Sequence, residues 1–191
     1  MPRPAATLQQ RLRLVPFEPA TAEGLQVNAS LSWFISGRLT LNFEVLSADG
    51  LDILVLPPHL TDGEQPSGMR RDGLWTTTCF EAFLGLPGES MYWEINLAAN
   101  GDWAVYRFTD YRSGQEEQTH PDSPQVHVRR WKHQLGLEAS LDLSTWWPQS
   151  ICPDVALTTV LDCGDKGLSY WAISHPGVQA DFHQRSAFLK S

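Results

Sequence analysis

The stretch from Leu39 to Val45 reads LTLNFEV, and apolar residues occupy every second position in it. A period of two is typical of a β-strand that buries one face and leaves the other in water. The same alternation recurs from Leu135 to Leu143, which reads LGLEASLDL. These two stretches predict amphipathic strands that contribute to one hydrophobic core.

Strand-like runs continue on both sides of this pattern, at residues 31–36, 76–84, 91–97, 102–108, 125–131, 155–161 and 169–175. Turn signals separate them, and Asn100-Gly101 between two runs favours a hairpin. We find no segment with a long helical period. Many short strands without helices predict an all-β fold, an antiparallel β-sandwich of jelly-roll or immunoglobulin-like type.

The length of 191 residues predicts a single domain. We expect residues 1–25 to form an N-terminal tail with an edge strand around Leu12 to Phe17, and residues 26–191 to form the sandwich. Two polar stretches, Leu56 to Gly73 and Thr109 to Pro124, are predicted loops. Loops of this length in a compact domain are often functional or mobile.

Charge and composition exclude several classes of partner. The chain has 14 basic and 22 acidic residues and a net charge of −8, which argues against nucleic acid and anionic membranes as partners. No stretch approaches the roughly 20 apolar residues of a membrane span, and Met1 to Glu23 lacks the apolar segment of a signal peptide. We therefore expect a cytoplasmic protein, with Cys79, Cys152 and Cys163 as reduced structural thiols.

Motifs for nucleophilic catalysis, phosphate binding and helical zinc sites are missing from the sequence. Asp181-x-His183 comes closest to a metal-ligand pair, although a C-terminal loop fixed by side-chain hydrogen bonds explains it more simply. We predict no metal and no cofactor. A calcium site made of carboxylates and carbonyl groups leaves no spacing signature in a β-protein and stays open.

Two glutamates stand in the middle of successive strand-like runs. Glu94 alternates with Tyr92 and Asn96, so these three side chains share one face, and Glu81 precedes them in the previous run. A solvated sheet face would explain them, and so would the carboxylate pair of a glycosidase. Sugar recognition fits better, because carboxylates and amides bind hydroxyl groups while an indole ring stacks on a pyranose.

Seven of the eight tryptophans divide by their position in the pattern. Trp33, Trp93 and Trp171 alternate with apolar neighbours and are predicted core residues. Trp75 follows the long polar loop and Trp103 follows the Asn100-Gly101 turn, so both are predicted at a sheet rim. Trp146 and Trp147 lie in a Ser/Thr/Pro loop and are also candidates for a stacking surface.

Three segments together resemble the family 9 carbohydrate-binding modules. They are Leu74–Leu84 (LWTTTCFEAFL), Tyr92–Gly101 (YWEINLAANG) and the ending Tyr170–Pro176 (YWAISHP) with Asp181-Phe182-His183 and Phe188. The match is most similar to the DOMON-like branch of that superfamily and spans about residues 30–190. It implies a non-catalytic β-sandwich that binds soluble sugars or, in other DOMON branches, haem.

The resemblance also implies roles for individual residues. Trp75 falls on one half of the family's aromatic clamp, and Trp147 and Trp171 are the options for the other half. Glu81 and Asn96 fall on sugar-contacting positions, whereas Glu94 stands where sugar-binding members can carry an arginine. A haem ligand set would pair Met69 or Met91 with His175 or His183.

We therefore predict a non-catalytic module that binds a small carbohydrate, an oligosaccharide or a similar polar ligand. Its predicted ligand-binding residues are Trp75, Glu81, Tyr92, Glu94, Asn96 and Trp103. The alternatives are a haem-binding domain, an interaction domain without a small ligand, and a glycosidase that uses Glu81 and Glu94.

Overall fold

A computed structural model of the chain describes residues 7–57, 68–118, 123–148 and 150–191. The strands in these ranges are β1 (Leu8–Pro16), β2 (Leu25–Trp33), β3 (Arg38–Ser47), β4 (Cys79–Gly85), β5 (Tyr92–Ala98), β6 (Trp103–Phe108), β7 (Glu116–Glu117), β8 (Gln125–Arg130), β9 (Gln134–Asp142), β10 (Asp154–Asp162) and β11 (Leu168–Ala172). Short 3₁₀ turns lie between them, η1 (Pro19–Ala22), η2 (Leu51–Ile53), η3 (Leu74–Thr76) and η4 (Gly164–Lys166), and η5 (Arg185–Ala187) follows β11. Within the described ranges, no helix has the length and apolar character needed to cross a membrane.

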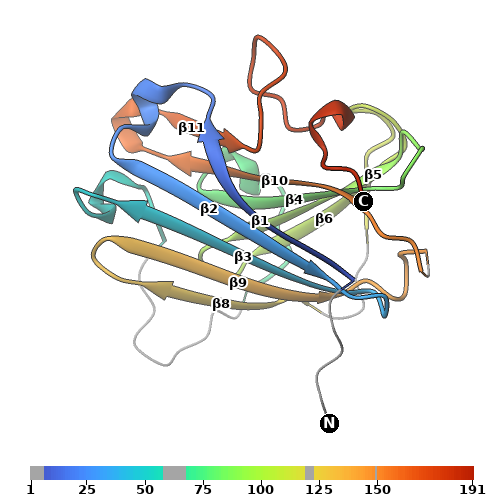
Figure 1. Cartoon of the computed structure of the whole chain (residues 1–191). Coiled ribbons are helices and arrows are strands. Elements are labelled where there is room, and N and C mark those ends of the chain that lie inside the picture. Colours follow the sequence, from blue (N-terminus) through green and yellow to red (C-terminus); the bar gives the residue numbers. More distant parts are fainter. Residues whose placement is uncertain (1–6, 58–67, 119–122, 149) are drawn as a thin grey trace.

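The eleven strands of the described residues form one sheet in the order β7-β6-β5-β4-β10-β11-β1-β2-β3-β9-β8. The neighbouring strands all pair antiparallel, so the predicted all-β antiparallel fold is confirmed. The sheet curls into a half-barrel, and β1, β2, β3, β9 and β8 lie across β4, β5, β6 and β10 (Figure 1). Phe43 of β3 contacts Phe80 of β4 with 5.3 Å between ring centroids. The curl thus closes the larger hydrophobic core between its two halves.

The N-terminal strand is present, but the prediction that it is an edge strand on a tail is wrong. Residues Leu8 to Leu14 of β1 pair with β2, and Val15 and Pro16 pair with β11. The strand therefore joins the two halves of the sheet, and its Leu14 is buried in the larger core. A strand with partners on both sides belongs to the fold, so the boundary expected near residue 25 does not separate a tail from it.

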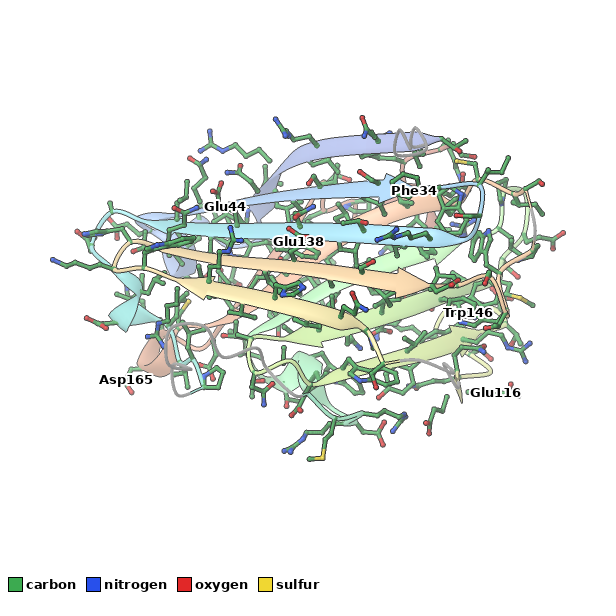
Figure 2. The ribbon with its side chains drawn as sticks, turned by 90° about the horizontal axis from the view of Figure 1, so that it is seen from below. Phe34, Glu44, Glu116, Glu138, Trp146 and Asp165 are labelled. Carbon is green, nitrogen blue, oxygen red and sulfur yellow. The ribbon has the colours of Figure 1, made fainter. Side chains whose placement is uncertain are left out.

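The outer faces of the two halves of the sheet differ in their exposure to solvent. The outer face of β3 and β9 carries polar side chains such as Glu44 and Glu138 (Figure 2). Strands β4 and β5 instead have every residue buried, on both faces. A second, smaller hydrophobic cluster covers their outer face and includes Phe83, Tyr92 and Phe188. The segment after β11 thus acts as a cover, and a solvated face around Glu81 and Glu94 is excluded.

The tryptophans follow this division. Trp33, Trp93 and Trp171 lie in the larger core, as predicted, and Trp147 joins them. Trp75 is 40% exposed, in agreement with a rim position. The rim position predicted for Trp103 is wrong, because its register opposite Leu97 turns the indole onto the inner face of the sheet, where it is buried. Cys79, Cys152 and Cys163 are free thiols, and Cys79 and Cys163 are buried.

Candidate functional site

A cavity of about 300 Å³ opens on the covered face, between the sheet and the segment that follows β11. Its lining comes from η3, β4, β5, β6, β10 and β11, from the loop after β6 and from the C-terminal segment. The lining residues are Trp75, Glu81, Phe83, Glu94, Phe108, Arg112, Gln115, Val160, Tyr170, Ala180, Phe182 and His183. This volume lies at the lower end of the range for small-molecule sites.

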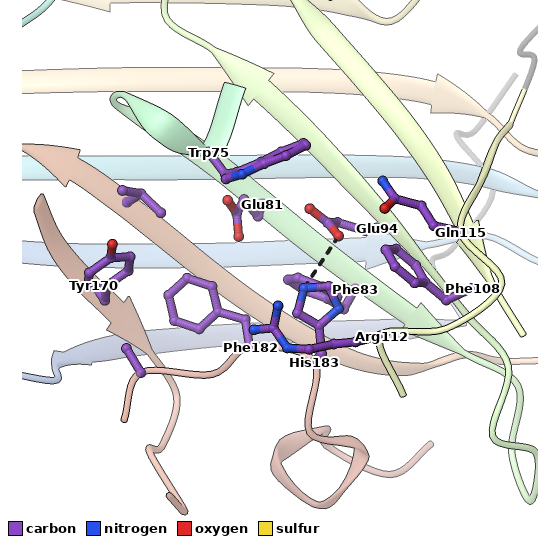
Figure 3. A pocket seen from close by; sticks show the side chains of 12 residues that line it. Trp75, Glu81, Phe83, Glu94, Phe108, Arg112, Gln115, Tyr170, Phe182 and His183 are labelled. Carbon is purple, nitrogen blue, oxygen red and sulfur yellow. Dashed lines mark ion pairs between the residues drawn. The ribbon is translucent and has the colours of Figure 1, made fainter. Parts of the chain in front are cut away.

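Glu81 and Glu94 are brought together by the register of β4 and β5. Glu81 lies opposite Asn96, and Phe83 lies opposite Glu94, so the two glutamates are diagonal neighbours on one sheet face. Both side chains are buried, and their carboxyl groups point into the same space near Trp75 (Figure 3). The sequence pattern predicts a mid-strand position for both glutamates. The pairing register of β4 and β5 brings their side chains to the same cavity.

Each carboxyl group has a neutral hydrogen-bond donor. Thr158 Oγ1 donates to Glu81 Oε2 at 3.0 Å, and Asn96 Nδ2 donates to Glu94 Oε1 at 2.8 Å. Burial, followed by the charge of Glu94, raises the pKa of Glu81 to about 8. Burial also raises the pKa of Glu94 to about 7. Near neutral pH the pair therefore retains protons and can donate hydrogen bonds as well as accept them.

His183 lies against the same carboxyl pair, with Nε2 at 3.8 Å from Glu94 Oε2. Burial and the nearby charge of Arg112 lower the pKa of His183 to about 4, so the ring is neutral at pH 7. Its Nδ1 is 2.7 Å from the Tyr92 hydroxyl, which also accepts the backbone N–H of Arg112 at 3.2 Å. We assign the Tyr92 proton to the bond with Nδ1. The proton on the imidazole then sits on Nε2 and faces Glu94.

Asp181 fixes the wall that holds His183. It accepts hydrogen bonds from the Tyr111 hydroxyl (2.6 Å), from Arg112 Nη2 (2.9 Å) and from the Gln184 amide (3.1 Å). Burial opposes its ionisation, yet these donors lower the pKa of Asp181 to about 2. The interpretation of Asp181-x-His183 as a hydrogen-bonded C-terminal loop is confirmed. Within the ranges described, no group of three or more His, Cys, Asp and Glu side chains could hold a metal ion.

Aromatic rings form most of the remaining wall. Trp75 stands at one side of the cavity, and Phe182, Arg112 and His183 stand at the other (Figure 3). Trp75 contacts Tyr106 in a T-shaped arrangement with 5.8 Å between centroids, and the residue remains 40% exposed. Neither option for a second clamp tryptophan reaches the cavity, because Trp147 and Trp171 lie in the larger core. Phe182 and Tyr170 supply the aromatic surface across from Trp75.

The six residues predicted to bind ligand therefore form three groups according to their location. Trp75, Glu81 and Glu94 line the cavity. Tyr92 and Asn96 lie one layer behind, where they hold His183 and Glu94 in place. Trp103 belongs to the opposite face of the sheet, so we remove it from the candidate site.

Sequence reasoning missed the residues that loops bring to the cavity. Arg112 and Gln115 come from the polar loop after β6, a stretch without periodicity that pattern analysis could only mark as a loop. The charge of Arg112 acts on Glu94 and partly offsets the effect of burial on its pKa. The Asp181-Phe182-His183 motif was the one signal that pointed to the C-terminal wall.

Comparisons with known proteins support the fold. A scan of protein-family models finds no match, and a search of curated proteins finds no relative. Among solved structures, the chain is similar to a Bacteroides uniformis protein described as a putative carbohydrate-binding protein. The TM-score is 0.62 at 12% sequence identity, over 94% of this chain and 84% of the other. At this identity the likeness establishes a shared all-β architecture.

Proposed function

We propose that this protein is a non-catalytic binding module for a small carbohydrate or a similar polar ligand, which it holds in the cavity beside Trp75. The observation that carries the proposal is one cavity that combines an exposed indole with two buried carboxyl groups. A pyranose presents C–H faces to an aromatic ring and hydroxyl groups to polar side chains, so it needs both kinds of surface. The carbohydrate-binding description of the Bacteroides uniformis protein supports the same ligand class.

The finer fold assignment belongs to this proposal. We propose that the curled sheet is a β-sandwich of the DOMON type, on the strength of the Trp75, Glu81 and Asp181-Phe182-His183 motifs. We further propose that the protein acts in the cytoplasm and binds its ligand without a cofactor. An absorption spectrum recorded with and without added haem tests the haem alternative, which needs a methionine ligand that the described part of the cavity lining does not supply.

The test is a calorimetric and thermal-shift screen of the full chain against monosaccharides and disaccharides. We expect at least one sugar to bind, and Trp75→Ala to weaken its binding by about tenfold or more. Trp131→Ala is the matched control, because Trp131 is 52% exposed and lies in the turn between β8 and β9, outside the cavity lining. Equal affinities of wild type and Trp75→Ala, or a screen without any binding sugar, would contradict the proposal.

A second function is favoured by a specific observation, the pair of raised carboxyl pKa values in one cavity. A glycosidase uses two carboxyl groups that flank the scissile bond, one as an acid and the other as a base or nucleophile, and Glu81 and Glu94 both line this cavity. Aryl glycosides of several sugars, incubated with wild type and with Glu81→Gln and Glu94→Gln, test this alternative. If the wild type hydrolyses a glycoside and each substitution abolishes the hydrolysis, the protein is an enzyme. If the wild type binds a sugar without hydrolysis, the non-catalytic module is supported.

A further inference from the structure

The described part of the chain buries four acidic side chains, and they differ in how their charge is balanced. Asp154 lies 2.8 Å from Lys190 and 3.1 Å from Arg185, and Asp102 lies 3.0 Å from Arg71. Glu81 and Glu94 form no ion pair with a lysine or arginine of the described residues, and the one ion-pair contact of Glu94 is with neutral His183. A buried carboxylate without a cation is costly, so the unbalanced pair requires an explanation.

Arg112 balances the pair only in part, because its charge favours the ionised form of Glu94 without forming an ion pair with it. Its guanidinium lines the cavity, but Nη2 is committed to Asp181 at 2.9 Å. With both glutamates ionised, the cavity and its wall therefore hold three acidic groups against one cation. The positive charge that would complete the site is missing from the described protein and can be supplied by a ligand.

The rest of the lining suits an organic cation. Trp75, Phe83, Phe108, Tyr170 and Phe182 line the same cavity as the two carboxyl groups. Aromatic faces attract ammonium groups through their electron-rich π-systems, and this attraction is largest where water is excluded. Aromatic rings with adjacent carboxylates thus form a surface that prefers an alkylammonium group over a neutral hydroxyl.

We propose that the cavity binds the ammonium group of its ligand, and that the carbohydrate it selects is an amino sugar. This inference rests on the proposed function and narrows its ligand class. The ring of the sugar stacks on Trp75, and its protonated amine lies between Glu81 and Glu94. A neutral sugar of the same shape forms no ionic contact with the carboxyl pair, which then stays protonated.

Proton release follows from this arrangement. Burial raises the pKa of both glutamates, and an ammonium group beside them favours the ionised form, so binding near pH 7 expels protons. The other titratable groups around the pair are Cys79 on β4, Tyr92 and Tyr106 on β5 and β6, Arg112 in the loop, and Asp181 and His183 in the C-terminal segment. At pH 7 none of these has a pKa close enough to neutrality to imitate the release.

The experiment is calorimetry of the full chain at pH 7 with glucosamine, glucose and N-acetylglucosamine, in two buffers of different ionisation enthalpy. We expect glucosamine to bind about tenfold more tightly than the two neutral sugars and to release protons. The double variant Glu81→Gln/Glu94→Gln should lose both the preference and the proton release. Choline and its neutral carbon isostere 3,3-dimethylbutanol form a second pair of probes.

The outcomes separate this inference from the proposed function. If glucosamine and glucose bind equally well and Trp75→Ala weakens both, the ammonium site is wrong. The proposed sugar-binding function is then retained. Preference for choline over its isostere without any sugar binding supports the ammonium site and overturns the carbohydrate assignment. No binding of any probe overturns both. Proton release by the wild type also tests the inference without relying on a variant.

Discussion

Two regions of the sheet bury acidic side chains: the surroundings of Asp154 and the cavity that holds Glu81 and Glu94. They have opposite effects on the stability of the fold. Asp154 begins β10, and it accepts hydrogen bonds from Arg185, Lys190 and the backbone N–H of Ser191, so it ties the C-terminus to the sheet. Among the described residues, Glu81 and Glu94 meet neutral donors, which include Thr158 and Asn96. The first arrangement stabilises the fold. The second lowers the stability of the fold and leaves the carboxyl groups available to bind a ligand.

The largest expected effect comes from neutralising the unbalanced pair. In the unfolded chain Glu81 ionises near the ordinary glutamate pKa of 4.5, and in the folded chain burial raises this pKa to about 8, so the folded state holds an extra proton between these values. The free energy of unfolding therefore falls as the pH rises from about 4.5 to about 8. Glu81→Gln removes this loss, and we expect the variant to be more stable than wild type at pH 9 by on the order of 3 kcal/mol.

Urea unfolding at pH 4 and pH 9 measures this difference. At pH 4, where the carboxyl group is largely protonated in both states, wild type and variant should have similar stability. If Glu81→Gln is instead destabilising at pH 9, the carboxyl group is balanced by a cation and the contrast with Asp154 disappears.

The opposite sign is expected for Asp154→Asn. Burial opposes ionisation of Asp154, but the bonds from Lys190 and Ser191 and the charges of Lys190 and Arg185 lower its pKa below 3.8. Its contribution is therefore fully present above pH 4 and disappears as the pH falls through the folded-state pKa. We expect a loss of about 2 kcal/mol at pH 7.

Asp165→Asn is the matched control for Asp154→Asn, because Asp165 is exposed in η4. It should change the free energy of unfolding by less than about 0.5 kcal/mol. Equal effects of the two substitutions would show that the ion pairs of Asp154 contribute nothing specific to the fold.

Apart from the control Asp165→Asn, the smallest effect on stability is expected for Trp75→Ala. The indole is 40% exposed and its described ring contact is the edge-on one with Tyr106, so we expect a loss below about 1 kcal/mol. Ligand affinity should fall much more. A loss of several kcal/mol in chemical unfolding would identify Trp75 as a core residue and remove it from the site.

The sequence predicted most of the strands, although the run expected at residues 31–36 overlaps β2 (Leu25–Trp33) only in part and β7 (Glu116–Glu117) lies in a predicted loop. Alternation placed Tyr92, Glu94 and Asn96 on one side of β5 and Trp93 on the other, because side chains of a strand alternate whatever covers them. Whether the outer face meets water depends on the segment after β11, more than 70 residues later. That long-range contact has no local signal, so the solvated and covered alternatives could not be separated.

The errors have the same origin. Trp75 and Trp103 both follow a loop or turn, and only the register with β5 turns Trp103 inward. The N-terminal strand gave no indication of how many partners it has, because pairing on both sides depends on β2 and β11. Arg112 lies in a loop without periodicity, and its approach to the cavity depends on the Asp181 hydrogen bond.

The most direct test of the proposed site is a titration of the ¹⁵N-labelled protein with glucosamine and glucose, followed through the indole N–H signals of its eight tryptophans. The Trp75 signal is assigned by its absence from the spectrum of Trp75→Ala. We predict that this signal shifts most, while those of the core residues Trp33, Trp93 and Trp171 change little. Saturable binding that shifts the Trp131 signal and leaves Trp75 unchanged would place the ligand elsewhere and contradict the account.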